Sequence, residues 1–151
     1  MGKVDALLAR LNGQRVYIDA NYLIYFLNQS APFFDVVAPI FQACDRGDFI
    51  GFTGDAVVAE VMVRPYRLKS PSEIAKGKSL FSRKSFLSIV SHDAPTFDLA
   101  SQLRANTNMR MLDALHYATA VQSSCRFLLT NDRDFKTTGT LEVVGIASLL
   151  G

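Results

Sequence analysis

The sequence predicts a three-layer α/β/α sandwich with a central parallel sheet of about four to five strands. Short β-rich runs alternate with segments of helical periodicity, and this alternation favours parallel pairing through right-handed crossovers. The length of 151 residues is that of one ordinary domain, and no repeat, low-complexity tract or long linker divides it. We therefore expect a single domain over residues 1–151, with helices on both faces of the sheet.

Five short segments have the composition of strands. They are rich in β-branched and aromatic residues, which fit the pleated surface of a sheet. The expected strands are 15–19, 49–53, 85–91, 126–130 and 141–145.

The segments between these strands have the spacing and the end signals of helices. Gly54 or Asp55 is expected to cap one helix, which Pro65 is expected to end. Ser70 followed by Glu73 three residues later is a capping signal for the next helix. The expected helices are 20 to about 27, 32–48, 55–63, 70–84, 94–108 and 109–124.

Composition predicts a protein of the cytoplasm. Hydrophobic residues make up 49% and charged residues 20%, as in soluble globular proteins. No apolar run approaches the roughly 18 to 20 residues that span a bilayer, and the N-terminus lacks the apolar core of a signal peptide. We expect no membrane contact, and we expect Cys44 and Cys125 to be buried free thiols in a reducing compartment.

Basic residues are concentrated in one segment, although the net charge is only +2. Residues 64–84 contain seven of the 16 basic residues and one acid, so this segment is at +6 while the rest of the chain sums to −4. Such a cluster is either a solvated helical face or a surface that follows nucleic-acid phosphates.

Four acids stand where the local sequence gives no reason for them to face solvent. Asp19 ends the first strand, Glu60 is the only charge in AVVAEVMV, Asp113 lies in a mainly apolar helix, and Asp132 follows the fourth strand. Functional crevices of open parallel sheets lie at the carboxyl ends of the strands. Carboxylates that meet there repel one another unless a cation lies between them, and oxygen ligands favour Mg²⁺ or Mn²⁺.

Each acid also has an ordinary structural interpretation. Asp19 is a suitable helix cap, Asp113 gains from the helix dipole, and Asp132 is a common turn residue. Glu60 has the alternative of extending to the surface, because an unpaired buried carboxylate is costly. The metal-site hypothesis is favoured because it explains all four acids through one site.

The order of four motifs resembles the PIN domain family, specifically its VapC-like toxin ribonucleases. The motifs are YIDANYLI, AEVMVRP, MLDALHYATA and LLTNDRDF, and the resemblance extends from about Val16 to the C-terminus. It implies that Asp19, Glu60, Asp113 and Asp132 form a catalytic acidic quartet that binds metal. Asp134 is a further candidate ligand, and the supporting polar residues would be Asn21, Thr130 and Asn131. Ala20 departs from the threonine that often follows the first aspartate of the family.

The resemblance also implies an activity and partners. The expected reaction is Mg²⁺- or Mn²⁺-dependent hydrolysis of RNA with one or two metal ions, leaving a 5′-phosphate and a 3′-hydroxyl. Arg64, Arg67 and Lys69 would hold the RNA backbone, and Tyr66 or Tyr117 would stack on a base. A small antitoxin that masks the acids, and a homodimer, are the expected protein partners.

Neither histidine is expected to take part. His116 has no partner evident from spacing and is interpreted as a helix residue at the core margin, and His92 is expected to be exposed.

Three other functions fit the same fold class. A phosphatase similar to the haloacid dehalogenase family would have a second aspartate where this chain has Asn21. A receiver-like signalling module would pair an acid with Asp19 on the first strand, where this chain has Ile18, and would place a lysine late in the chain, whereas Lys136 directly follows no strand. The remaining alternative is a catalytically silent PIN-fold scaffold that binds RNA or protein.

Overall fold

A parallel five-stranded sheet forms the centre of the molecule. The computed structural model describes residues 2–83, 86–131 and 139–151. The strands are β1 (Arg15–Ile18), β2 (Ile50–Gly54), β3 (Leu87–Val90), β4 (Phe127–Thr130) and β5 (Glu142–Gly145). Their order across the sheet is β3-β2-β1-β4-β5, and every neighbouring pair is parallel. The predicted fold class is therefore confirmed.

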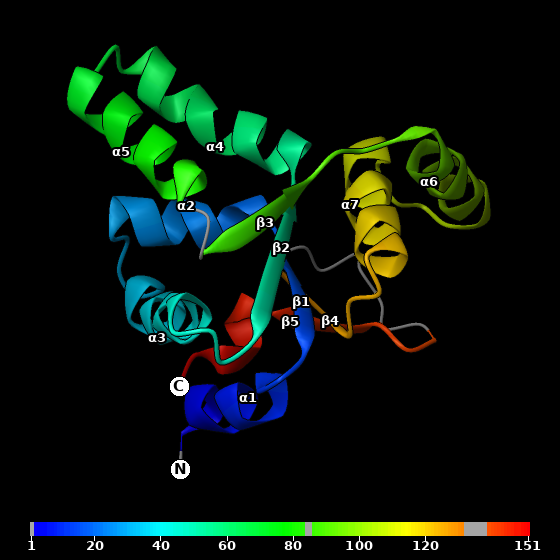
Figure 1. The fold of residues 1–151 in the computed structure, drawn as a ribbon, viewed down its shortest axis with the longest axis horizontal. Helices are drawn as coiled ribbons and strands as arrows, with labels where there is room; N and C mark the ends of the chain where they lie inside the picture. Colours follow the sequence, from blue (N-terminus) through cyan, green and yellow to red (C-terminus); the bar gives the residue numbers. More distant parts are fainter. Residues whose placement is uncertain (1, 84–85, 132–138) are drawn as a thin grey trace.

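Helices cover both faces of this sheet (Figure 1). One layer contains α6 and α7, and helices α1 to α5 lie on the other side with their apolar faces in a separate core. The helices are α1 (Lys3–Leu11), α2 (Ala20–Asn28), α3 (Phe34–Asp45), α4 (Asp55–Arg67), α5 (Pro71–Ser82), α6 (Ala94–Asn106) and α7 (Met111–Gln122), and a 3₁₀ turn, η1 (Ile146–Leu149), follows β5.

The alternation of side chains along β1 divides the core into these two parts. Val16 and Ile18 pack in the core on the side of α1 to α5, whereas Tyr17 between them packs on the side of α6 and α7. Successive strand side chains point to opposite faces, and all three are fully buried, as expected for a central strand of a parallel sheet.

The register of the central strands sets the position of the first acid. Ile18 is opposite Leu129 in the β1–β4 pairing, and the Asp19 N–H donates to the Leu129 carbonyl at 2.9 Å. Asp19 and Thr130 therefore leave the carboxyl ends of adjacent strands side by side. This is the edge at which ligands bind to open parallel sheets.

Several helix ends differ from the prediction. Helix α4 runs through Pro65 to Arg67, so the expectation that Pro65 ends it is wrong. The Ser70 side chain caps α5 by accepting from the Glu73 N–H, as the sequence predicts. Helix α1 was not among the expected elements. It buries Leu7 and Leu11 in the core on the side of α1 to α5.

Both cysteines are buried free thiols, as predicted. Burial raises the pKa of each thiol to about 12, so neither is a reactive thiolate at neutral pH. In the part of the chain that the structure describes, no helix is both long enough and apolar enough to cross a membrane.

Candidate metal centre at the carboxyl ends of the strands

Asp19 lies between β1 and α2 and is held on both of its carboxylate oxygens. Oδ1 accepts from the Ala20 N–H at 2.7 Å, and Oδ2 accepts from the Thr130 hydroxyl at 2.8 Å. The residue is only 5% exposed. Asp19 is thus the N-cap of α2, as the structural interpretation proposed, and it is also a buried carboxylate at the sheet edge.

Glu60 reaches the same place from the middle of α4. Its Oε1 lies 2.8 Å from His116 Nε2, and its side chain is one-third exposed. The residue lines a cleft together with Asp19. Glu60 therefore turns toward the strand ends and does not extend to the open surface.

Asp113 enters this cleft from the first turn of α7. Its side chain is 13% exposed, and its Oδ2 accepts from Arg110 Nε at 3.1 Å. This position near the helix N-terminus gains from the helix dipole, as the structural interpretation proposed. The dipole and the cleft are compatible, because the N-terminal end of α7 is the end that faces the carboxylates.

The cleft has a volume of about 510 Å³ and is mainly polar. Its lining residues are Asp19, Asn21, Glu60, Arg110, Leu112, Asp113 and Asn131. Three of the predicted acids and two of the predicted supporting residues are therefore brought together. Asp132 and Asp134 lie outside the described residues, and the catalytic and metal-binding roles of all these side chains stay predictions.

Two of the supporting residues make specific contacts. Thr130 orients Asp19 through its hydroxyl, and Asn131 donates from Nδ2 to the Tyr25 hydroxyl at 3.3 Å. The third, Asn21, lines the cleft from the first turn of α2.

His116 is the residue of this site that sequence reasoning missed. It is 1% exposed, and its Nε2 lies 2.8 Å from Glu60 Oε1 and 3.8 Å from Asp19 Oδ1. One ligand atom from each of these three residues lies within 4.8 Å of the other two. The sequence-based interpretation of His116 as a residue at the core margin without a partner is therefore wrong, because it is fully buried and contacts Glu60. Its spacing of three residues from Asp113 along one helix was the available signal.

The second histidine is also buried, contrary to expectation. The His92 side chain is 5% exposed, and its Nδ1 lies 2.7 Å from the Thr119 hydroxyl. Its ring meets the His116 ring edge-on, with 5.7 Å between the ring centroids. His92 thus packs against His116, and its Nε2 lies 3.5 Å from the Asp55 carboxylate.

The electrostatics of the cluster favour positive charge between the carboxylates. Burial raises the pKa of Asp19 above its ordinary value, although the His116 charge and the hydrogen bonds from Ala20 and Thr130 act against it. Burial lowers the pKa of His116, but the hydrogen bond to Glu60 and the charges of Asp19 and Glu60 outweigh burial, so this pKa is raised. Both groups hold protons more tightly than in water.

The donor chemistry fits a hard divalent cation. Asp19, Glu60 and Asp113 supply carboxylate oxygens, which Mg²⁺ and Mn²⁺ prefer, and no thiol takes part among the described residues of the cleft. A buried carboxylate with a raised pKa needs a proton or a cation nearby, and a divalent ion would replace the protons that the cluster otherwise retains.

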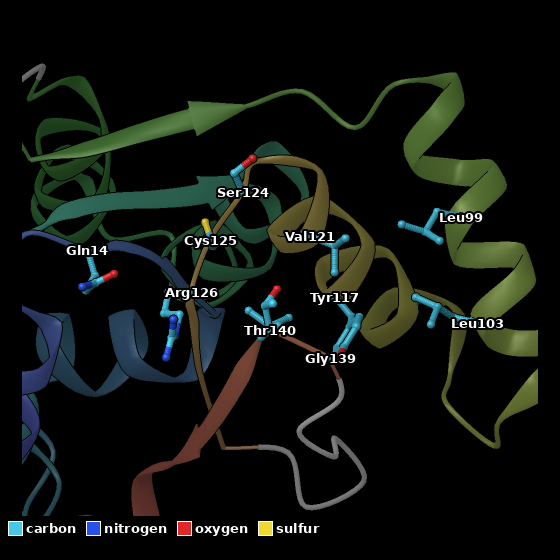
Figure 2. Close-up of a pocket in the computed structure, with 11 residues that line it drawn as sticks. Gln14, Leu99, Leu103, Tyr117, Val121, Ser124, Cys125, Arg126, Gly139 and Thr140 are labelled. Carbon is cyan, nitrogen blue, oxygen red and sulfur yellow. The ribbon is translucent and has the colours of Figure 1, made fainter.

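A larger cavity lies at the opposite edge of the sheet. It has a volume of about 640 Å³, and Figure 2 shows Gln14, Arg126 and Thr140 on the segments that precede β1, β4 and β5. Leu99, Leu103 and Val121 contribute apolar surface from α6 and α7. None of the described residues that line it is an acid or a histidine, and burial raises the pKa of its one cysteine, Cys125, to about 12, so it lacks the carboxylate ligands of the cleft.

Comparison with solved structures gives several relatives in fold. VapBC2 from Rickettsia felis, bound to a DNA fragment from its promoter, matches with a TM-score of 0.69 and 18% identity over 87% of this chain and 98% of that chain. VapC20 from Mycobacterium tuberculosis, a sarcin-ricin loop cleaving toxin, matches with a TM-score of 0.65 and 11% identity over 79% and 91%. A toxin-antitoxin complex from Klebsiella pneumoniae matches with a TM-score of 0.63 and 19% identity over 87% and 97%.

Sequence comparison identifies the family. No curated protein matches the chain by sequence. The pattern of the PIN domain matches residues 16–141, which include all four motifs and the three acids of the cleft. With the parallel sheet and the carboxylates at its edge, this match shows that the chain belongs to the PIN domain family.

Proposed function

We propose that this protein is a divalent-metal-dependent endoribonuclease and the toxin of a VapBC-type toxin–antitoxin pair. The observation that carries the proposal is the meeting of Asp19, Glu60 and Asp113 in one cleft at the carboxyl ends of the strands. These acids come from three separate helix starts or helix faces, and a fold alone does not require them to converge. The kinship with PIN domains and the fold shared with VapC toxins support the same function.

The cleft residues have distinct parts in the proposed mechanism. Asp19, Glu60 and Asp113, with Asp132 or Asp134, would hold Mg²⁺ or Mn²⁺. The ion would lower the pKa of a water molecule and neutralise charge on the departing oxygen. Thr130 fixes one oxygen of Asp19, and Arg110, which lines the cleft, would contribute a positive charge toward the scissile phosphate. The hydrogen bonds from Ala20 and Thr130 hold the Asp19 carboxylate in one orientation.

RNA is the proposed substrate, and the end of α4 is the proposed surface for its backbone. Arg64 and Arg67 follow Glu60 by four and seven residues on the same helix, so they continue its face away from the cleft. In the described part of the chain, neither they nor Lys69 forms an ion pair with a carboxylate, which leaves their charges available to phosphates. The similar structure from M. tuberculosis is that of a sarcin-ricin loop cleaving toxin, which supports this class of substrate.

Tyr66 is the better of the two tyrosines proposed to stack on a base. It is 52% exposed beside these basic side chains. Tyr117 is 3% exposed and packs in the core under α7, so stacking on a base is not available to it.

An antitoxin is the proposed protein partner. A small groove of about 150 Å³ adjoins Glu60, and Ile24, Leu27 and Val61 give it an apolar floor. An apolar side chain seated there would place the next residues of a partner over the carboxylates. The similar structures from R. felis and K. pneumoniae are toxin–antitoxin assemblies, which supports such a partner. A homodimer is proposed as the state of the toxin.

The function is tested by incubating RNA with the protein and Mg²⁺ or Mn²⁺, with and without EDTA. We expect cleavage that leaves 5′-phosphate and 3′-hydroxyl ends, that EDTA stops, and that Asp19→Asn and Asp113→Asn each reduce by at least about a hundredfold. Asp98→Asn, which removes an exposed carboxylate on α6, is the matched control and should cleave normally. RNA binding without metal-dependent cleavage by the wild-type protein would favour the silent scaffold.

A further inference from the structure

We propose that His116 is a positioning residue that holds Glu60 in the orientation that binds metal, and that Tyr17 and Gly54 fix the His116 ring for this task. The inference rests on the proposed function, because it assigns a role within the same cleft. His116 is not one of the residues to which the family resemblance assigns a role.

Both nitrogens of the His116 ring are engaged. Nε2 lies 2.8 Å from Glu60 Oε1, and Nδ1 lies 2.8 Å from the Tyr17 hydroxyl. That hydroxyl in turn accepts from the Gly54 N–H at 2.9 Å. The chain of contacts therefore begins at a backbone amide at the end of β2 and ends at a carboxylate on α4.

This arrangement determines which nitrogen carries the proton in the neutral ring. The Tyr17 hydroxyl oxygen accepts a hydrogen bond from the Gly54 N–H. Its single hydrogen is then satisfied if it donates to His116 Nδ1. The proton of the neutral imidazole then lies on Nε2, where it donates to Glu60. An Nε2 that carries a proton has no lone pair for a metal ion. His116 therefore orients a ligand and is not one itself.

Close packing around Gly54 keeps the Tyr17 hydroxyl in place. A Cβ at position 54 would lie 2.6 Å from Tyr17 Oη and would also collide with the His92 ring. The absence of a side chain is thus what allows the hydroxyl to reach both the Gly54 amide and His116. Tyr17 is itself fully buried on β1, two residues before Asp19, so the same strand positions the carboxylate and its support.

The test compares metal binding in His116→Gln and His116→Leu without RNA. Glutamine places an amide N–H near the position of Nε2 and can still donate to Glu60, whereas leucine cannot. Titration calorimetry with Mn²⁺ should give weaker binding by about tenfold to a hundredfold for leucine and nearly normal binding for glutamine. Tyr17→Phe keeps the ring but loses the hydroxyl, and it should weaken Mn²⁺ binding by a smaller factor. His92→Gln is the control for loss of a buried imidazole whose nearest described carboxylate is that of Asp55, at 3.5 Å, and not a proposed metal ligand.

Each result has one meaning. Equal weakening by glutamine and leucine would overturn the positioning role in favour of direct ligation by the ring. Normal binding by leucine and by Tyr17→Phe, with Asp19→Asn failing to bind, would overturn the role while leaving the proposed function intact. Normal binding by Asp19→Asn would overturn the proposed metal centre itself. If the leucine variant does not fold, Tyr17→Phe and glutamine decide between the first two results.

Nitrogen-15 NMR of the histidine rings separates a positioning role from direct ligation of the metal by the ring. The chain has two histidines, so His92→Gln assigns both ring spectra. At a pH at which the ring is neutral, we expect His116 to carry its proton on Nε2 without metal and to keep it there when Mg²⁺ is added. Loss of the Nε2 proton on addition of Mg²⁺ would overturn the inference.

Discussion

Asp19 has a structural and a chemical position at the same time. As the N-cap of α2 it satisfies the Ala20 N–H, and as a buried carboxylate it faces the cleft. One oxygen serves the helix and the other accepts from Thr130, so the side chain cannot rotate without losing one of these hydrogen bonds. A cap ordinarily contributes about 1 kcal/mol to stability, which does not require a residue to be buried. The burial of Asp19 is explained by the cleft.

Removal of the Thr130 hydroxyl should therefore weaken metal binding in addition to lowering stability, because this hydroxyl orients Asp19. Thr130→Val keeps the volume of the side chain and removes the donor to Asp19 Oδ2. We expect a loss of about 1 to 2 kcal/mol in the free energy of unfolding and about tenfold weaker Mn²⁺ binding. Urea unfolding and titration calorimetry measure the two effects.

Thr53→Val is the matched control for this substitution. Thr53 is equally buried, and its hydroxyl donates to the Ile18 carbonyl at 2.8 Å, a backbone group next to the cleft. This variant should lose similar stability and keep its affinity for Mn²⁺. If both valine variants weaken Mn²⁺ binding equally, then Thr130 has no special role in orienting Asp19.

The sequence identified the acids of the cleft better than the groups that support them. Asp19, Glu60 and Asp113 were found because a charge among apolar residues is costly and needs an explanation. His116 and Tyr17 give no such signal, because a histidine or tyrosine is common at the edge of a core. Their contact joins residues 99 positions apart, and only the packing of α7 against β2 and β4 brings them together.

At the scale of elements, local signals predicted where strands and helices lie but not every helix end. Proline inside a helix removes one hydrogen bond, and α4 nevertheless continues through Pro65 because its apolar face packs on α2 and α5. The cap of α6 is Asp93, which precedes the first helical residue, and its carboxylate accepts from the Thr96 N–H at 3.0 Å. Tertiary contacts and cap geometry thus decide ends that periodicity leaves open.

The charge of the Asp93 cap predicts a pH dependence of stability. The side-chain and backbone hydrogen bonds from Thr96 hold the pKa of Asp93 below its ordinary value of 3.8. A carboxyl with a lowered pKa in the folded state stabilises the fold above the unfolded value and loses this effect as the pH falls through the folded value. Wild type should therefore be more stable than Asp93→Ala at pH 6, and the difference should shrink below pH 3.8. Urea midpoints over this range measure it.

Asp93→Asn separates the cap from its charge. Asparagine accepts the same backbone hydrogen bond but does not titrate. The difference between Asp93→Asn and Asp93→Ala should stay constant with pH, whereas the difference between wild type and Asp93→Asn should change in the acid range. A difference between wild type and Asp93→Asn that does not vary with pH would show that ionisation of Asp93 does not contribute to folding.

At the scale of the whole molecule, the topology separates two edges of the sheet with different chemistry. The order β3-β2-β1-β4-β5 puts β1 at the centre, so the residue that follows it can meet side chains from both helical layers. Glu60 arrives from one layer and Asp113 from the other. This convergence was predictable in outline, because in a parallel α/β fold the residues that follow the strands all lie at the carboxyl edge of the sheet. The amino-terminal edge holds the larger cavity and no carboxylates among its described lining residues.

The position of the carboxylates at one edge of the sheet predicts how salt should affect RNA binding. Arg64 and Arg67 lie on α4 after Glu60, whereas Lys3 lies at the start of α1 and Arg46 at the end of α3. If the RNA backbone lies along α4, each arginine–phosphate contact that is removed should reduce the slope of log K against log salt by about 0.7 for single-stranded RNA. Neutralising both arginines to glutamine should therefore reduce the slope by about 1.4 and weaken binding at low salt.

The measurement uses fluorescence anisotropy of a labelled single-stranded RNA over a range of KCl concentrations. An Asp19→Asn background keeps the RNA intact during the titration, because it removes a proposed metal ligand. The double variant of Lys3 and Arg46 to glutamine has the same net charge as the variant of Arg64 and Arg67, so it controls for long-range attraction. Equal slopes in the two double variants would mean that net charge, and not the face of α4, attracts the RNA. A lower slope only in the α4 variant would locate the path of the backbone next to the three carboxylates, where the proposed cleavage requires it.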